Sequence, residues 1–299
     1  MGRIEMEVGA TLALLAPTEP AVRRDVGKLI EALSAPPYGE DPGRWRESQA
    51  RLAQSLEHFE RATEGEERKR WLRLRCEQLV AARALESAAE LVTSALAQGN
   101  DPELLVVRAE VSWLFVRDGR QWTASIPTPA SAVADLGEVL AKAPDHLAAR
   151  YLRGRLRGRA GDPAGGLSDL LAFVRRANPG RGRFEETRFP PSVGLLWGGL
   201  APGKRDALAA PISRLIRNDP HGRFGGWRLR LAHLHSNAGE LQAAARELAW
   251  LADPRNSTGV PASLRRHRDV FAALAVSLND GRDPVARERL GALFADVDA

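Results

Sequence analysis

The residue types that usually carry out catalysis are sparse in this chain and do not form catalytic patterns. The closest histidines, His233 and His235, lie two residues apart and would point in different directions on a helix, so they form a poor metal site. The single cysteine, Cys76, falls in a predicted helix (71–82) with no histidine nearby, which favours packing over a nucleophilic role. Neither a phosphate loop ending in Lys-Ser/Thr nor a Gly-x-Ser-x-Gly motif is present. We therefore expect no enzymatic activity, no metal site and no cofactor.

Side chains suited to binding are more prominent. Tyr151, Arg155 and Arg159 are spaced i, i+4 and i+8, so on a helix they form one line along a face. Arginine binds carboxylates in a planar fork and tyrosine adds a rigid contact, so this line suits an acidic peptide or a C-terminal carboxylate. The alternative is that Arg155 and Arg159 are simply solvated.

Two turn-rich segments carry further aromatic residues. In residues 119–129 (GRQWTASIPTP), Trp122 is either an anchor for a partner or a side chain that folds back onto the helices. Residues 178–190 interleave arginines with phenylalanines, a pattern compatible with nucleic acid or with an acidic protein. The interleaved residues are Arg181, Arg183, Phe184, Arg188 and Phe189.

The positive charge is concentrated in one window. The chain of 299 residues has 43 basic and 38 acidic residues, a formal net charge of +5, and only four of the basic residues are lysines. That arginine bias is typical of a GC-rich bacterial genome. Residues Arg150 to Arg188 contain ten arginines against four acidic residues, a local charge of +6. Such a patch favours an acidic partner, either a protein or a nucleic acid.

Composition predicts a globular chain in a reducing compartment. The apolar share of 44% and the charged share of 27% are ordinary for folded proteins, and no stretch reaches 18 apolar residues. One cysteine excludes an intrachain disulfide, which fits the cytoplasm. A short apolar run, residues 8–16, follows Glu5 and Glu7, so we expect a capping segment there; the alternative is a secretory signal.

A recurring apolar triad with spacing i, i+4, i+7 marks one face of a helix in successive parts of the chain. The triads are Ala88/Val92/Ala95, Ala132/Leu136/Val139, Gly166/Leu170/Phe173, Leu208/Ile212/Leu215, Ala244/Leu248/Leu251 and Ala286/Leu290/Leu293, with a weaker copy at Leu52/Leu56/Phe59. Offsets of 34 to 44 residues between copies indicate an array of similar helical units.

Glycines and prolines keep phase with these triads. Gly161, Gly203, Gly239 and Gly281 each stand five residues before a triad, where a tight turn between two helices needs positive φ. Prolines follow the helix of the triad at Pro144, Pro179, Pro220 and Pro254, where they would end one unit and start the next.

These features resemble the tetratricopeptide repeat, a helix–turn–helix unit of about 34 residues. The best copy runs from Leu147 to about Pro179, with Gly154, Gly161–Asp162, Gly166, Leu170, Phe173 and Asn178–Pro179 at family positions. The resemblance covers residues 67–294, and it implies an all-α, right-handed α-solenoid of antiparallel helix pairs, with about six to seven helical hairpins. The departures are Leu196 and Leu274 at small-residue positions and insertions near 119–129 and 180–190. A generic helical bundle or a HEAT-like solenoid is the alternative.

The resemblance also implies which side chains line a concave groove. The first helix of each pair lines that groove, which places Tyr151, Arg155 and Arg159 in it, and adds Trp197, His233 and Asn237 from later copies. Together with Trp122, these are the candidate partner-binding residues.

We therefore expect a non-enzymatic protein–protein interaction scaffold or adaptor of the bacterial cytoplasm, working alone or as a subunit of a larger complex. An N-terminal capping segment (1–66) would precede a repeat domain (67–299) that binds an acidic peptide or protein. Changing Arg155 and Arg159 to Glu should weaken this binding. Two alternatives are a nucleic-acid-associated protein that uses the Arg150–Arg188 patch, and a bacterial envelope-assembly factor.

Overall fold

A computed structural model describes residues 41–120, 122–179, 181, 183–219, 224–280 and 285–298. Within these ranges every regular element is a helix and no strand forms, which confirms the predicted all-α class. The helices fall into two compact units; the first ends at Gly166 and the second begins at Leu167. The predicted division into a capping segment and a repeat domain stays a prediction, and residues 8–16 lie outside the described part of the chain.

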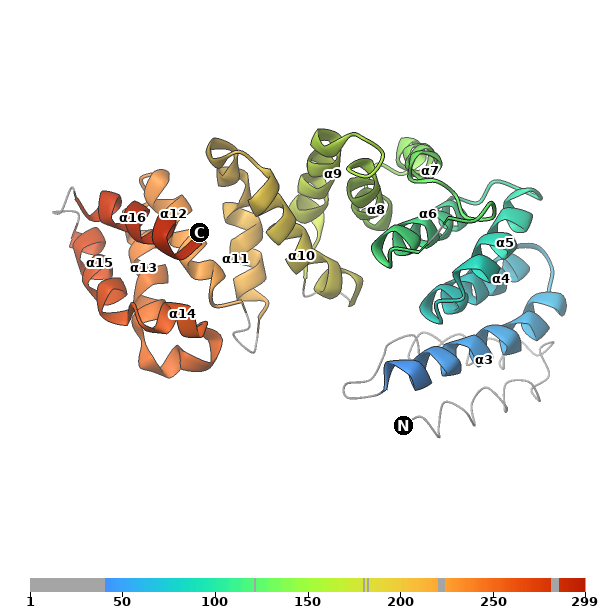
Figure 1. Cartoon of the computed structure of the whole chain (residues 1–299), viewed down its shortest axis with the longest axis horizontal. Coiled ribbons are helices and arrows are strands. Elements are labelled where there is room, and N and C mark those ends of the chain that lie inside the picture. Colours follow the sequence, from blue (N-terminus) through green and yellow to red (C-terminus); the bar gives the residue numbers. More distant parts are fainter. Residues whose placement is uncertain are drawn as a thin grey trace. The chain divides into compact units, whose positions relative to one another are not determined.

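The helices follow one another along the chain (Figure 1), and a longer connection at the predicted insertion near 119–129 separates α6 from α7. The first unit holds α3 (Pro42–Arg61), α4 (Gly65–Ala81), α5 (Leu85–Leu96), α6 (Pro102–Arg117), α7 (Pro129–Lys142) and α8 (Leu147–Arg157), and α9 (Pro163–Arg176) spans the boundary. The second unit holds α10 (Arg183–Gly199), the 3-10 helix η1 (Pro202–Leu208), α11 (Ala209–Arg217), α12 (Trp227–Asn237), α13 (Leu241–Ala252), the 3-10 helix η2 (Pro254–Gly259), α14 (Ala262–Arg265), α15 (Arg268–Asp280) and α16 (Ala286–Asp298).

Several helices begin at a polar cap followed by proline. The Asp41 and Asp101 carboxylates accept hydrogen bonds from the amides of Gly43 and Glu103, at 2.8 and 2.9 Å, and Thr128 caps α7 in the same manner. Proline is favoured in the first turn because its missing N–H would have no partner there. The sequence therefore sets the starts of α3, α6 and α7 locally.

The apolar triads form the core of the helical pairs. All their members are buried except Ala95 and Leu293, which are half-buried. They lie on α3, α5, α7, α9, α11, α13 and α16, most of which are the second helix of a pair. Leu208, the first member of the triad of α11, is the last residue of η1. We call the first helix of each pair (α4, α6, α8, α10, α12 and α15) the leading helix.

Each of four interhelical turns contains one residue with a left-handed backbone conformation. Arg83, Gly119, Gly161 and Gly239 have φ of 64°, 63°, 91° and 79°. After each, the next amide N–H donates to the carbonyl five residues earlier, at 2.8 to 3.2 Å, as in a Schellman motif. The predicted turn roles of Gly161 and Gly239 are thus confirmed. Arg83 stands five residues before the Ala88 triad and adopts the backbone that glycine adopts elsewhere.

Two connections differ from expectation. Gly203 lies inside η1 without positive φ, so its predicted turn role is wrong: a 3-10 helix, and not a glycine turn, joins α10 to α11. Gly281 lies outside the described residues. The predicted loop over 178–190 is also wrong in its second half, because α10 begins at Arg183 and continues through Pro190 and Pro191. Phe189 is fully buried and the Phe184 ring lies 6.1 Å from that of Phe173, so packing overrides the proline signal.

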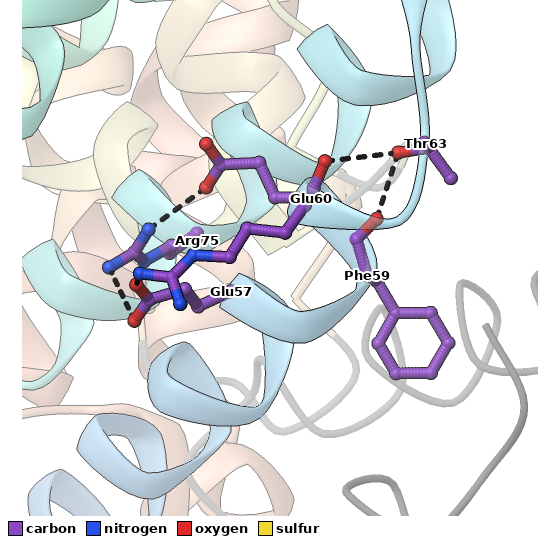
Figure 2. A network of polar contacts seen from close by, with 6 residues as sticks. Glu57, Phe59, Glu60, Thr63 and Arg75 are labelled. Atoms are coloured by element: carbon purple, nitrogen blue, oxygen red, sulfur yellow. Dashed lines mark hydrogen bonds and ion pairs between the residues drawn. The ribbon is translucent and has the colours of Figure 1, made fainter.

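In the first unit the leading helices α4, α6 and α8 pack side by side, and α5 and α7 each pack between two of them; we call this arrangement the row. α3 packs on α4 through a polar network (Figure 2). The Arg75 guanidinium of α4 contacts the carboxylates of Glu57 and Glu60 on α3, each at 2.9 Å. The Thr63 hydroxyl donates to the Phe59 carbonyl at 2.8 Å at the end of α3.

The second unit ends in a closed arrangement of helices. α12 packs on α13, α13 on α15, α15 on α16, and α16 returns to α12; we call these four helices the ring. Earlier in this unit, Arg214 of α11 donates to the carbonyls of Val174, Arg175 and Ala177 at the end of α9, at 2.6 to 3.0 Å. Burial lowers the pKa of Arg214.

Candidate partner-binding site

The predicted binding residues are distributed over both units. Tyr151 and Arg155 lie on α8, and Arg159 and Trp122 lie in connections of the first unit. The other three lie on leading helices of the second unit: Trp197 on α10, and His233 and Asn237 on α12. Because the two groups belong to different units, each is described separately.

The predicted line of Tyr151, Arg155 and Arg159 does not form. The Tyr151 side chain is 3% exposed and belongs to the core of α8. α8 ends at Arg157, so Arg159 lies in the following turn, where it is exposed. Arg155 is half-buried, and its guanidinium carbon lies 4.3 Å from the centroid of the Trp113 ring on α6. The first unit therefore presents an arginine–aromatic contact between two leading helices, not a tyrosine–arginine line.

Trp122 folds back onto α6 but remains partly exposed, and its role as an anchor for a partner stays a prediction. Its ring centroid lies 5.7 Å from that of Phe115 on α6, yet 44% of the residue is exposed. The Arg120 guanidinium lies 4.6 Å from the Phe115 ring, and Ile126 anchors the connection with 4% exposure. One side of the Trp122 ring is thus held by the row while the remainder faces solvent.

In the second unit, Trp197, His233 and Asn237 come together. The Asn237 amide nitrogen lies 3.1 Å from His233 Nε2. The His233 ring is parallel to that of Phe294 of α16, with centroids 4.2 Å apart and 6° between planes. Trp197 meets Phe294 edge-on at 5.8 Å and Trp227 edge-on at 6.2 Å. Two leading helices therefore gather aromatic side chains around a phenylalanine supplied by a third helix.

Arginines frame this aromatic cluster. The Arg230 guanidinium lies 4.6 Å from the Trp227 ring centroid and 5.4 Å from that of Trp197, and Arg205 of η1 lies 4.9 Å from Trp197. Cation–π contacts of this kind hold a guanidinium over a ring face. We call Trp197, Trp227, Arg230 and His233 the aromatic seat.

Sequence reasoning missed Trp227, Arg230 and Phe294. The spacing of Trp227 and Arg230, three residues apart at the start of α12, is a signal that places both on one helix face. No comparable signal exists for Phe294, because its neighbours Leu290 and Leu293 already satisfied the helical triad. Its position depends on α16 packing on α12, which a local pattern does not encode.

Each unit also contains a cavity beside a leading helix. A cavity of about 460 Å³ in the first unit lies between the starts of α4 and α6 and the end of α5. Its lysine and one of its arginines have acidic neighbours: Lys69 pairs with Glu66 at 2.6 Å and Arg73 lies 3.9 Å from Asp101. A smaller cavity of about 190 Å³ in the second unit is lined by Arg230, Phe294 and Val297 among others.

The Arg150–Arg188 window is divided between the two units at residue 166. In the first unit, Arg150 donates to the Pro144 carbonyl at 2.8 Å, and the Arg157 side chain lies 3.5 Å from Asp162. These arginines therefore already have intramolecular partners. The side chain of Arg183 lies outside what the structure describes.

Several described residues of types that can serve in catalysis are buried or paired with a neighbour. Cys76 is fully buried, as predicted for a packing residue, and burial raises the pKa of its thiol to about 12, so the thiol stays protonated at neutral pH. His235 contacts Glu240 at 2.5 Å and His146 contacts Glu103 at 3.2 Å. Among the residues with described placement, no three His, Cys, Asp or Glu side chains are grouped as metal ligands.

Comparison of the chain with protein-family models, with curated proteins and with solved structures gives no match. In the described part of the chain, none of the helices combines the length and the apolar character that crossing a membrane requires.

Proposed function

We propose that the protein is a non-catalytic scaffold of tetratricopeptide-like helical hairpins that binds a segment of an acidic protein partner on its leading helices. The observation that carries this proposal is the aromatic seat, in which α10 and α12 hold a phenylalanine side chain between His233 and Trp197. Rigid aromatic side chains and arginine dominate binding at protein interfaces because they bury a large area at a small entropic cost. The arginines around the seat favour acidic partners.

The repeated construction supports the tetratricopeptide-like part of the proposal. The left-handed turn residue, the buried triad five residues later and the packing of neighbouring leading helices in the row follow one another in the order that such hairpins require. A right-handed solenoid is the arrangement that we propose for these hairpins.

Site-specific photo-crosslinking tests the proposed binding face. A benzophenone side chain would replace Asn237, which is exposed and contacts His233, and in a matched chain it would replace Ala249, which is exposed on α13. After irradiation in extract of the native cells, we expect the same protein adducts to form repeatedly at position 237 and not at 249. Equal adducts at both positions, or none at 237, would contradict binding through the leading helices.

The double change of Arg155 and Arg159 to Glu tests the first unit in the same assay. Reversing the charge of Arg155 also removes its contact with Trp113, so adducts with any partner that uses this face of the row should be lost. Unchanged adducts would show that the row does not contribute to binding.

A further inference from the structure

The aromatic seat is already occupied by a helix of the same chain. Phe294 of α16 stacks on His233 and meets Trp197 edge-on, and it is 8% exposed. In the row, α5 and α7 each pack on their own leading helix and on the next one along the chain, whereas α16 packs on its own leading helix, α15, and on the earlier leading helix α12. α16 therefore covers the face of α12 that the proposed function assigns to a partner.

The rest of the unit does not depend on α16 to stay connected. α13 already packs on both α12 and α15, so these three helices remain joined when α16 leaves. α16 has 13 residues, and a helix of that length is marginal in water without a surface to pack on. Its residence in the seat thus depends on its buried side chains, chiefly Ala286, Leu290 and Phe294.

The sequence of α16 shows which chemistry the seat accepts. After Phe294 the helix ends with Asp296, Val297 and Asp298, without a basic residue. Val297 lines the same cavity as Arg230, so the last turn of α16 and Arg230 border one space. An aromatic residue followed by acidic residues matches the aromatic and cationic side chains of the seat.

The fit of α16 is incomplete. The cavity of about 190 Å³ at its C-terminal end is bordered by Leu229, Arg230 and Leu264 on one side and by Phe294 and Val297 on the other. α16 therefore leaves space beside Phe294 and Arg230 that it does not fill.

We infer that the aromatic seat is the docking site for a partner helix that carries a phenylalanine followed by acidic residues, and that α16 occupies the seat until such a partner displaces it. This inference rests on the proposed function and adds the chemistry of the partner and its competition with α16.

A labelled peptide with the sequence of residues 285–298 is the probe. We would measure its fluorescence anisotropy with the full chain, with Phe294→Ala and with Glu288→Ala, which changes an exposed position on the same helix. Since the tethered α16 competes at an effective concentration on the order of millimolar, we expect roughly tenfold or more tighter binding to Phe294→Ala than to the unchanged chain. The Glu288→Ala chain should behave like the unchanged chain.

Changes in the peptide test its chemistry. Replacing its phenylalanine by alanine should abolish binding to the Phe294→Ala chain, and replacing both aspartates by asparagine should weaken binding severalfold, most clearly at low salt. Hydrogen exchange of the full chain with excess unchanged peptide should show faster exchange in α16, and His233→Ala should speed exchange there without altering α16 itself. This second measurement stands even where Phe294→Ala perturbs folding.

Absence of peptide binding to Phe294→Ala, together with unchanged exchange in α16 upon His233→Ala, would overturn the inference. A concentration-dependent dimer that exchanges α16 between copies, detected by light scattering, would also overturn it and would assign the seat to a second copy. If the peptide fails to bind while position 237 still crosslinks a partner, the proposed function stands without the role of α16. If the peptide binds but no protein is crosslinked at position 237, the contact between α16 and the seat stands and the proposed partner does not.

Discussion

The row and the ring are built from the same kind of helical hairpin but end differently. In the row, α4, α6 and α8 pack in sequence, and each added hairpin extends the arrangement. In the ring, α16 returns to α12 and covers it. The turn at Gly161 and the turn at Gly239 have the same hydrogen bond across a left-handed glycine. Local turn geometry therefore does not decide between extension and closure.

The difference lies in what the leading helix offers to its neighbours. On the row, Trp113 of α6 receives Arg155 from the next leading helix, α8. On the ring, the His233 side chain of α12 stacks on Phe294 of α16. A leading face can thus be covered by the next leading helix or by the second helix of a later hairpin, and in the second case α12, α13 and α15 keep their mutual contacts when that one helix, α16, leaves.

The largest expected effect comes from breaking the ionic contact that joins α3 to the row. Arg75→Ala removes the cation that contacts Glu60, whose side chain is 10% exposed, while Glu57 keeps its pair with Arg61. Removing one partner of a largely buried ion pair is strongly destabilising, and we expect a loss of about 2–4 kcal/mol in the free energy of unfolding. Urea unfolding gives the total loss, and hydrogen exchange locates it in α3 and α4.

Arg214→Ala is the matched change in the second unit. It removes three hydrogen bonds to carbonyls at the end of α9, which water can partly replace, so we expect about 1–2 kcal/mol. A larger loss for Arg214→Ala than for Arg75→Ala would show that capping of α9 matters more than the network of α3 and α4.

Substitutions in the turns should have effects no larger than that of Arg214→Ala. Gly161→Ala and Gly239→Ala place a side chain on a left-handed backbone, which costs about 1–2 kcal/mol, although neither site has a neighbour within 4 Å of the added carbon. Because both turns share one geometry, the two losses should agree within about 0.5 kcal/mol. Gly137→Ala, in the middle of α7 with open space around it, is the control and should stabilise by about 0.5–1 kcal/mol. Thermal unfolding measures all three changes. A clearly larger loss for Gly239→Ala would show that the stability of the ring depends more strongly on its turn than that of the row does.

Most of the architecture was predictable because it depends on local chemistry. Triads at i, i+4 and i+7 identified helices and their buried faces, and Gly161 and Gly239 marked turns, because burial and positive φ restrict residue type strongly. The same reasoning could not identify the turn at Arg83, because its backbone is left-handed but arginine is not a residue type that indicates such a turn. The start of α10 was missed because Pro190 and Pro191 are unusual inside a helix and are tolerated here by the packing of Phe189.

The candidate site was predictable only in part. Trp197, His233 and Asn237 could be chosen because repeat phase places them on leading helices, and they do lie together. Arg155 stands at the repeat position of Trp197 and His233 but contacts Trp113; Tyr151, one helical turn earlier, is buried, and Arg159, at the position of Asn237, lies beyond the end of α8. Phase predicts the face of a helix but not what later covers that face, which is why Phe294 was not anticipated.

The smallest expected effect is a pH dependence confined to the row. His146 directly precedes α8, and its Nε2 lies 3.2 Å from Glu103 in the first turn of α6. The hydrogen bond that His146 Nε2 donates to the Glu103 carboxylate raises the pKa of His146 above 6.5, and the same bond lowers the pKa of Glu103 below 4.5. The histidine contribution to stability is therefore complete below about pH 6.5 and lost as the pH rises through the raised value, whereas the glutamate contribution is complete above about pH 4.5 and lost as the pH falls through the lowered value.

Glu103→Gln isolates this pair. Since both groups are partly exposed, the unchanged chain should be more stable than Glu103→Gln by only about 0.2–1 kcal/mol, with the difference largest near pH 5.5 and smaller near pH 3.5 and pH 8.5. Urea unfolding at the three pH values measures the difference, and hydrogen exchange in α12 to α16 should be the same for both chains. A difference that grows steadily from pH 5.5 to pH 8.5 would contradict the raised pKa of His146 and would assign the effect of Glu103 to its place in the first turn of α6, where a carboxylate stabilises the helix without any histidine.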